Sequence, residues 1–263
     1  MKTYFIVNTC ILDSEPSLRD EQYKNGISKL IELTKDMENI QIIIVENNGA
    51  KQKYLEDYNN DVNCSTFYTN NNRNIETGNI GIKELIDVID CIKRFDIGDD
   101  DFIVKMNGRY VLNDDSAFIA ALKNTVVKTK EVTGTDDMVG VIDTNDVLTY
   151  TDAETDAVTD AMTVTEEATT VTDAVTDAVT KEVHCIIKYG SYDTPLPYRT
   201  GECISAIIGM RGKYVKQINI PRMEEKVENV WAAASLQIDE ENIMMLETLG
   251  INVCPGGNDY FVV

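Results

Sequence analysis

Apolar residues in the first 120 positions alternate between short runs and helical spacing. Residues 4–7, 40–45, 65–68 and 102–106 are short runs rich in β-branched and aromatic residues, which predicts four strands. Residues 19–36 and 80–95 place apolar side chains at intervals of three and four, which predicts amphipathic helices. Residues 54–58 predict a short helix, and the asparagine-rich stretch 70–74 predicts a loop. Strands that alternate with helices indicate an α/β fold built on a parallel sheet.

A similar pattern follows residue 183. Residues 185–189 and 204–210 predict two further strands, and residues 251–253 and 260–263 predict closing strands. Residues 224–237, which hold the single tryptophan, predict a helix. Residues 241–249 predict another helix, with Gly250 as its C-cap.

A four-residue motif, Thr-Asp-Ala-Val, recurs between these two halves. It stands in tandem at 155–162, with Met in the last position, and again at 172–179. The unit is far shorter than the roughly 20 residues of a solenoid repeat. Threonine and aspartate are also mediocre helix formers. We therefore interpret residues 131–183 as an acidic low-complexity insertion.

The composition narrows the possible partners. The formal net charge is −21, and residues 151–182 contribute −8 of it, with nine acidic residues against Lys181. So acidic a chain is a poor partner for nucleic acid, because repulsion opposes phosphate contacts. The sequence has no apolar run near the roughly 20 residues that span a bilayer, and residues 1–8 are typical of a first strand and not of a signal peptide. The six scattered cysteines and the single His184 suggest free thiols in a soluble cytoplasmic protein, without a zinc site.

Polar residues follow each predicted strand of the first half. Ligands of parallel sheets bind beyond the carboxyl ends of the strands, so these residues are expected to surround one crevice. Gly108 allows the backbone to approach a ligand closely. The planar guanidinium of Arg109 suits phosphate oxygens, although pairing with a nearby acid would also explain it. The strand-end residues are Asn8, Thr9, Glu46, Asn47, Asn74 and Asn107.

The segment 101–113, DFIVKMNGRYVLN, resembles a K-x-x-G-R-Y-x-L-N strand of a group of GT-A-type glycosyltransferases from surface-polysaccharide and viral glycan pathways. Other segments resemble this family in the same order along nearly the whole chain outside the repeats: 19–27, 42–48, 79–85, 226–231 and 249–251. The resemblance implies one GT-A-like domain over residues 1–263, with a Rossmann-type mixed sheet flanked by helices. Residues 1–125 would then bind a nucleotide sugar, and residues 184–263 a saccharide acceptor.

The resemblance also implies roles for single residues. Glu228 would be the base that takes the proton of the acceptor hydroxyl. Tyr110 and Trp231 would bind the acceptor, the tryptophan by stacking on the apolar face of a sugar. The residues implied to bind a UDP- or GDP-linked donor are Asn8, Thr9, Arg19, Glu46, Asn47, Asn74, Gly81, Lys83, Lys105, Asn107, Gly108 and Arg109.

The chain departs from many GT-A enzymes at the metal site. Their Asp-x-Asp motif lies at the carboxyl end of a strand and holds Mn²⁺ or Mg²⁺ against the diphosphate. Here residues 99–101 are acidic but precede the strand, whereas Lys105, Asn107 and Arg109 occupy its carboxyl end. A hard divalent cation needs oxygen ligands. We therefore expect cationic side chains to neutralise the leaving diphosphate, with a metal optional.

Two alternatives stay open. A nucleotidyltransferase would need a glycine-rich basic loop after the first strand, and residues 8–13 contain no glycine. A non-catalytic glycan-binding or virion structural protein on the same fold would explain both the missing Asp-x-Asp and the acidic insertion. Such a viral protein would be found in the host cytoplasm or in the virion. The donor sugar, the acceptor, the stereochemistry and the oligomeric state are not determined by these patterns.

Overall fold

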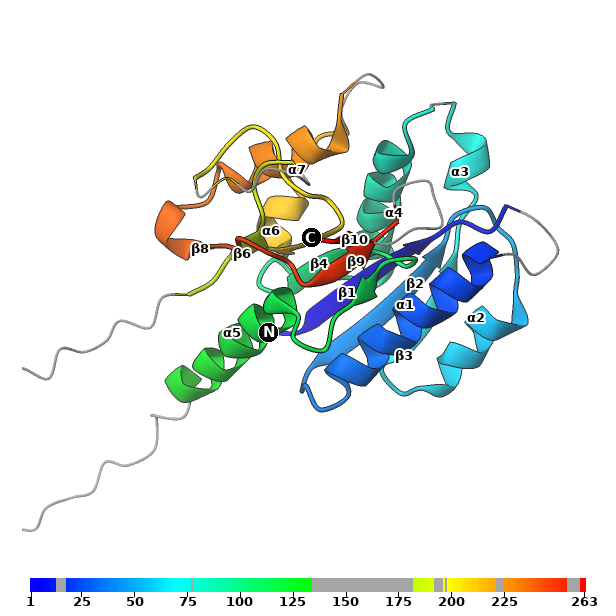
Figure 1. Cartoon of the computed structure of the whole chain (residues 1–263), viewed down its shortest axis with the longest axis horizontal. Helices are drawn as coiled ribbons and strands as arrows, with labels where there is room; N and C mark the ends of the chain where they lie inside the picture. The colour runs from blue at the N-terminus through cyan, green and yellow to red at the C-terminus, as the bar shows by residue number, and fades with distance from the viewer. Residues whose placement is uncertain are drawn as a thin grey trace, which may run out of the picture.

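The computed structural model describes residues 1–12, 18–76, 78–133, 182–191, 196, 198–220, 225–254 and 261–263 (Figure 1). Nearly all of the expected insertion at 131–183 lies outside these residues. No helix in the described ranges is long and apolar enough to cross a bilayer.

A seven-stranded mixed sheet forms the centre of the molecule, with strand order β3-β2-β1-β4-β7-β6-β8. The strands β1, β2, β3 and β4 run parallel, and β7 is antiparallel to both of its neighbours, β4 and β6. This arrangement, flanked by helices, confirms the predicted α/β class with a mixed sheet. The strands are β1 (Thr3–Thr9), β2 (Ile40–Glu46), β3 (Cys64–Tyr68), β4 (Phe102–Asn107), β6 (Cys185–Ile187), β7 (Ile207–Arg211) and β8 (Ile243–Met245).

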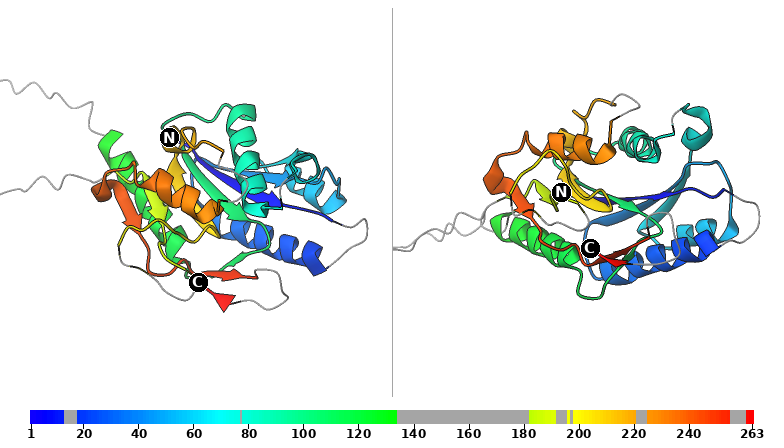
Figure 2. Two further views of the ribbon diagram at one scale, coloured as in Figure 1. Left: turned by 90° about the horizontal axis from the view of Figure 1, so that it is seen from above. Right: turned by 45° about the horizontal axis from the view of Figure 1, so that its top comes forward.

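Helices cover both faces of this sheet (Figure 2). One buried apolar cluster joins the sheet to α1 (Leu18–Thr34), α2 (Lys53–Asp57) and α5 (Ala117–Thr133). The other joins it to α4 (Ile80–Arg94), α6 (Gly212–Val215) and α7 (Val227–Ser235). Because apolar residues recur in α4 at helical spacing, one stripe of this helix is buried against the strands.

Short elements complete the fold. A three-stranded sheet of order β10-β9-β5 is built from β5 (Val111–Leu112), β9 (Ile251–Val253) and β10 (Phe261–Val262). The helix α3 (Asn71–Asn74) follows β3, and 3₁₀ turns cover Tyr58–Asn60 and Glu240–Asn242. The predicted closing strands therefore exist, but they pair with β5 and not with the main sheet.

Two secondary-structure predictions are wrong. Residues 241–249 form the end of a 3₁₀ turn and then β8, and not a helix. Pairing with β6, in which Ile243 lies opposite Cys185, overrides the local helical preference. Gly250 has φ +64° in the turn that leads into β9. The expected loop at 70–74 contains the short helix α3. The hydrophobic pattern did not predict β5, α5 or α6.

The parallel strands end in register at one edge of the sheet. Thr9 lies opposite Glu46, and Glu46 lies opposite Tyr68 on the third strand. On the other side of β1, Asn8 lies opposite Asn107 of β4. The predicted crevice residues at the ends of β1, β2 and β4 are therefore neighbours, as the rule for parallel sheets requires. We call this the carboxyl edge.

Candidate functional site

Asp87 of α4 is the centre of a hydrogen-bond cluster at the carboxyl edge. Its buried carboxylate accepts from Asn47 Nδ2 at 2.9 Å, Asn71 Nδ2 at 2.8 Å and Thr69 Oγ1 at 3.1 Å. A longer contact of 3.4 Å comes from Asn8 Nδ2. Burial raises the pKa of Asp87 to about 6, although these donors oppose the rise. One carboxylate therefore orients polar side chains that follow three different strands.

The amides of Asn8 and Asn47 are held in a defined orientation by this contact. Their nitrogens point to Asp87, and their oxygens are buried without a hydrogen-bond partner among the described residues. An unpaired buried acceptor costs about 1–3 kcal/mol. The cluster therefore holds polar groups in place at a cost to the stability of the fold.

Glu84, one turn before Asp87, binds the end of β4. Its carboxylate lies 2.7 Å from Lys105 Nζ and accepts from Asn107 Nδ2 at 3.0 Å. Lys105 also donates to the carbonyl oxygen of Ser205 at 2.8 Å. Because Lys105 is buried and paired, it is not presented to a ligand. This corrects the expectation that Lys105 neutralises a donor diphosphate.

Glu228 of α7 lies beside this pair. Its Oε1 accepts a hydrogen bond of 2.9 Å from Ser205 Oγ, and the side chain is partly exposed. Ser205 therefore contacts Lys105 through its carbonyl oxygen and Glu228 through its hydroxyl. Of these two glutamates, Glu84 is engaged by a lysine and an amide, whereas the contact made by Glu228 is to a neutral hydroxyl.

The turn after β4 packs tightly on its neighbours. Gly108 N donates to Asn8 O at 2.9 Å, and a Cβ on Gly108 would lie 3.0 Å from Thr9 Cγ2. On the other side, a Cβ on Gly26 of α1 would lie 2.3 Å from Gly108 O and 2.6 Å from Tyr110 O. Glycine is therefore needed at position 26 for close backbone packing, whereas a Cβ on Gly108 would make a tight contact with β1. The contacts that explain Gly108 are with the protein's own strand.

Arg19 contacts the residue after β1, and the charges of Lys83 and Arg109 act on groups at the same end of this strand. Arg19 Nη1 donates to Cys10 O at 3.3 Å, and Tyr23 OH bonds with Cys10 N at 2.8 Å. Burial raises the pKa of Tyr23, and the positive charges of Arg19 and Arg109 oppose that rise, so both guanidinium groups act on this phenol. Burial and then Glu46 raise the pKa of Cys10 to about 11, against the charges of Arg19 and Lys83.

Glu46 has a structural role in the two loops at this edge. Its fully buried carboxylate accepts from the backbone N–H groups of Ile11 at 2.9 Å, Asn48 at 3.2 Å and Ala50 at 2.7 Å. Thr9 Oγ1 donates to the Val45 carbonyl at 3.0 Å. The expectation that the Glu46 side chain meets a donor base is therefore corrected, because its oxygens hold the loops after β1 and β2.

Asn48, absent from the predicted donor-binding residues, links three segments. Its Nδ2 donates to Ile11 O at 2.6 Å, and its Oδ1 accepts from Arg73 Nε at 2.8 Å and Asn72 Nδ2 at 3.3 Å. Lys83 reaches the same region, since its Nζ donates to Asn72 O at 2.6 Å. These bonds place α3 against the ends of β1 and β2.

Four other predicted site residues do not face this cluster. Gly81 packs on α7, where an added Cβ would lie 2.3 Å from Val227 Cγ1. Asn74 is exposed at the end of α3. Tyr110 and Trp231 belong to the two buried apolar clusters, and only 1% of Trp231 is exposed. The burial of both rings does not support the predictions that Tyr110 and Trp231 bind an acceptor.

The end of β4 does not fit a divalent cation. The Glu84 carboxylate there is occupied by Lys105 and Asn107, and Asn107 Oδ1, the side-chain oxygen that β4 itself offers at its end, accepts from Arg109 N at 3.1 Å. The acidic residues 99–101 lie at the opposite edge, where Lys216 pairs with Asp99. Within the described ranges, no three His, Cys, Asp or Glu side chains are grouped as metal ligands.

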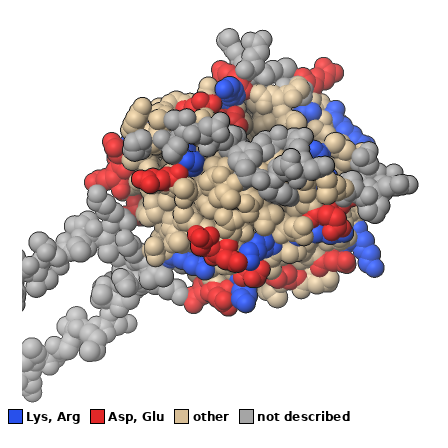
Figure 3. Space-filling model, viewed as in Figure 1, with Lys and Arg blue, Asp and Glu red and all other residues tan. Residues whose placement is uncertain are grey.

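Charge on the visible surface is mixed. Figure 3 shows acidic and basic side chains interspersed around a largely uncharged central area. Around Cys10 the charges are also mixed, since Arg19 and Lys83 oppose the effect of Glu46 and Asp87 on its pKa.

No family model and no curated protein matches the sequence. The solved structures similar to this chain include two of S. aureus TarS 1–349. The first is 14% identical over 94% of this chain and 58% of that chain, with a TM-score of 0.46. The second, in complex with UDP-GlcNAc, is 15% identical over 50% of this chain and 32% of that chain, with a TM-score of 0.31. This chain thus spans 58% of the length of the first structure.

Proposed function

We propose that this protein transfers a sugar from a nucleotide diphosphate donor to a saccharide acceptor. The observation that carries the proposal is that Arg19 of α1 contacts the residue after β1, while Lys83 of α4 bonds to Asn72 at the same edge and Arg109 lies in the turn after the neighbouring strand β4. Guanidinium and ammonium groups are the natural partners of a diphosphate. Their presence at one edge is notable in a chain with a net charge of −21.

The asparagine cluster is a second support. Asn8, Asn47 and Asn71 are fixed by one carboxylate, Asp87, beside the three cations. Of these three, Asn71 is partly exposed, and an amide held in this way can recognise the hydroxyl and N–H groups of a ribose or a base with little reorganisation on binding. The cations would then hold the diphosphate of a UDP- or GDP-linked sugar.

Glu228 is the proposed base. In the reaction, the acceptor hydroxyl oxygen bonds to the anomeric carbon, the bond from this carbon to the diphosphate oxygen breaks, and the diphosphate leaves with the electron pair. Glu228 takes the hydroxyl proton. Its partly exposed carboxylate supports this role, whereas Glu84 is held by Lys105 and Asn107.

Donor binding tests the cationic group. The wild type is to be heated with UDP-, GDP-, CMP- and dTDP-linked sugars, including UDP-GlcNAc, with and without Mn²⁺. We expect one nucleotide class to raise the melting temperature, and Arg109→Ala to abolish the rise while the protein stays folded. Arg94→Ala, at an exposed position near the far end of α4, is the matched control. A full rise with Arg109→Ala would refute the proposed diphosphate site.

Transfer to an acceptor, or donor hydrolysis in its absence, tests the base. Glu228→Gln keeps an oxygen for the Ser205 hydroxyl but cannot take a proton. We expect kcat to fall by about 10²–10⁴-fold while the donor-induced rise in melting temperature is kept. Glu241→Gln, an exposed acid on another element, controls for the loss of charge. Full activity of Glu228→Gln would remove it as the base.

A second candidate, a non-catalytic glycan-binding protein, is favoured by one observation. Glu84 neutralises Lys105, the cation nearest to the proposed base along the Ser205 contacts. A protein of this kind would bind saccharides but leave every nucleotide sugar in the panel intact.

A further inference from the structure

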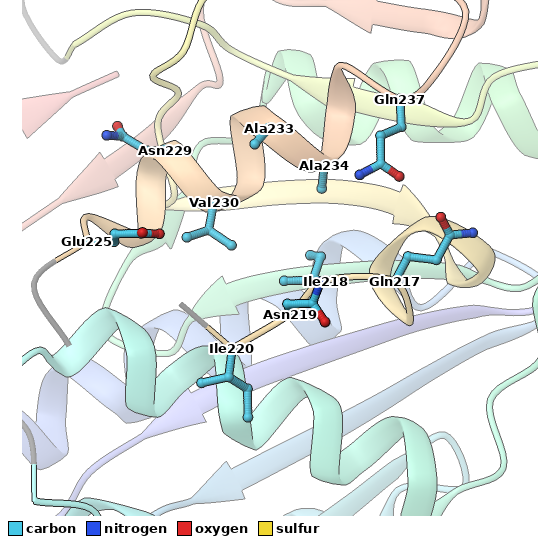
Figure 4. Close-up of a pocket in the computed structure, with 10 residues that line it drawn as sticks. All are labelled: Gln217, Ile218, Asn219, Ile220, Glu225, Asn229, Val230, Ala233, Ala234 and Gln237. Carbon is cyan, nitrogen blue, oxygen red and sulfur yellow. The ribbon is translucent and has the colours of Figure 1, made fainter. Parts of the chain in front are cut away.

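A hollow of about 520 Å³ lies between α7 and residues 217–220, outside the cluster described above (Figure 4). This volume is within the range of about 300–1,000 Å³ that is typical of small-molecule sites. Ser205 holds Glu228 at one side of α7, and Gly81 packs on Val227. The helix that forms one wall of the hollow is therefore held in place by α4 and by the segment before β7.

Carboxamides are the main polar groups around the hollow. The side chains of all four are exposed, and no hydrogen bond between described residues uses them. Each carboxamide offers both an N–H donor and an oxygen acceptor, as a sugar hydroxyl does. The arrangement suits a ligand that carries many hydroxyl groups. The four are Gln217, Asn219, Asn229 and Gln237.

The remaining surface is apolar and free of positive charge. Val230 and Ala234 point from α7 toward Ile218 and its neighbours (Figure 4). Such a floor can cover the C–H face of a sugar ring. Glu225 is the only ionisable residue among the described lining residues. A carboxylate without a cation disfavours phosphates and other anions, so the chemistry selects a neutral ligand.

A second hollow of about 420 Å³ shares Asn229 with the first. Its walls include Gly190, Thr200 and Glu202, which belong to the connection between β6 and β7. The two hollows therefore lie on either side of Asn229, the residue that follows Glu228. A ligand that fills both must be elongated and must pass over Asn229.

We propose that these two hollows bind a neutral oligosaccharide, namely the part of the acceptor chain away from the transfer point. This inference rests on the proposed function. The inference adds to that function a class of acceptor, an uncharged glycan of several residues. It also places the acceptor on a surface separate from the donor crevice. The residues that would contact the glycan are the four carboxamides together with Val230 and Ala234.

Direct binding tests this inference without any need for catalysis. The probes are neutral hexasaccharides of glucose, mannose, galactose and N-acetylglucosamine, their monosaccharides, and an anionic heparin hexasaccharide, measured by calorimetry. We expect one neutral hexasaccharide to bind more tightly than its monosaccharide and the anionic chain. Ala233→Trp, at an exposed lining position, should weaken this binding at least about tenfold by filling the first hollow. Ala120→Trp, an exposed alanine of α5 on the opposite face of the sheet, is the matched control.

A second variant separates a loss of glycan contacts from misfolding of Ala233→Trp. Asn219→Ala with Gln237→Ala removes two amides from exposed positions, and its effect on affinity should match that of Ala233→Trp in direction. Both variants must keep the wild-type rise in melting temperature with a nucleotide sugar. If no neutral hexasaccharide binds, or if Ala233→Trp binds as the wild type does, the inference is overturned while donor binding can still stand. If hexasaccharides bind as expected but no nucleotide sugar is bound or hydrolysed, it is the proposed transferase activity that fails.

Discussion

Two lysine–carboxylate pairs of nearly equal length lie at opposite edges of the main sheet. At the carboxyl edge, Lys105 and Glu84 are 2.7 Å apart, and their side chains are 3% and 12% exposed. At the amino edge, Lys216 and Asp99 are 2.6 Å apart, but 36% and 66% exposed. The charges at the first pair have lost most of their hydration, whereas those at the second have kept it. The distance between the charges therefore does not predict how much each pair matters to stability. Burial decides how much free energy of unfolding is lost when one partner is removed.

The two edges also differ in how their acids titrate. Burial raises the pKa of Asp87 at the carboxyl edge to about 6. At the amino edge, a hydrogen bond from His184 and the charge of Arg211 lower the pKa of Glu182. The carboxyl edge thus holds a carboxylate that the fold makes less acidic, and the amino edge one that it makes more acidic. Opposite dependence of stability on pH should follow.

The largest effect is expected from Glu84→Ala. The change leaves the charge of Lys105 buried without its partner, which costs about 3–5 kcal/mol of the free energy of unfolding. Asp99→Ala should cost under about 1 kcal/mol, because its pair is hydrated. Urea unfolding measures both.

The double variant Glu84→Ala, Lys105→Met tests the cause. If the unpaired charge is responsible, the double variant is more stable than Glu84→Ala alone. A double variant that is less stable than Glu84→Ala would contradict this explanation.

The second-largest effect on stability is expected from Asp87→Asn, and it depends on pH. Because the folded protein binds this proton more tightly than the unfolded chain does, the contribution of Asp87 is greatest in acid and decreases as the pH rises from about 4 to about 6. A rise of the pKa from 3.8 to about 6 corresponds to on the order of 3 kcal/mol. The free energy of unfolding of the wild type minus that of Asp87→Asn should fall over this range and then level off. Asp36→Asn, at an exposed site, corrects for net charge, and a difference that rises with pH would contradict the assignment.

The smallest effect is expected from Glu182→Gln, with the opposite sign. A lowered pKa means that this carboxylate stabilises the fold above its ordinary pKa of 4.5 and loses that contribution as the pH falls below it. The side chain is 63% exposed, so the effect should stay under about 1 kcal/mol. Thermal unfolding between pH 3 and pH 7 measures the difference from the wild type. Greater destabilisation at pH 3 than at pH 7 would reverse the expected order.

The spacing of apolar residues predicted the main strands and helices, because burying one face of an element requires apolar side chains at that spacing. The run 40–45 and the stripe of 80–95 became β2 and α4 with small changes at their ends. Elements whose positions depend on strands far away in the sequence were not predicted. The helix expected at 241–249 is replaced by β8, whose place is set by β6 more than 50 residues earlier, and β5 is only two residues long.

The site was predicted in outline only. The strand rule correctly brought Asn8, Glu46 and Asn107 to one edge, because register follows from the parallel sheet. It could not predict which of these side chains would form hydrogen bonds within the protein, as the Glu46 carboxylate does with the backbone of two loops. Glu84 and Asp87 were missed. The available signal was their spacing of three residues beside the apolar stripe of α4, which places both at the flank that faces the strand ends.

Gly26 determines how closely two backbone segments pack, and each segment carries one of the arginines proposed to bind the donor. Its helix carries Arg19, and the turn that it touches carries Arg109. A methyl group at position 26 would collide with the carbonyl oxygens of Gly108 and Tyr110 and would push the helix outward. The spacing of the two backbone segments that carry these arginines is thus set by a side chain of one hydrogen atom, and alanine at position 26 would shift both proposed diphosphate-binding residues without replacing either.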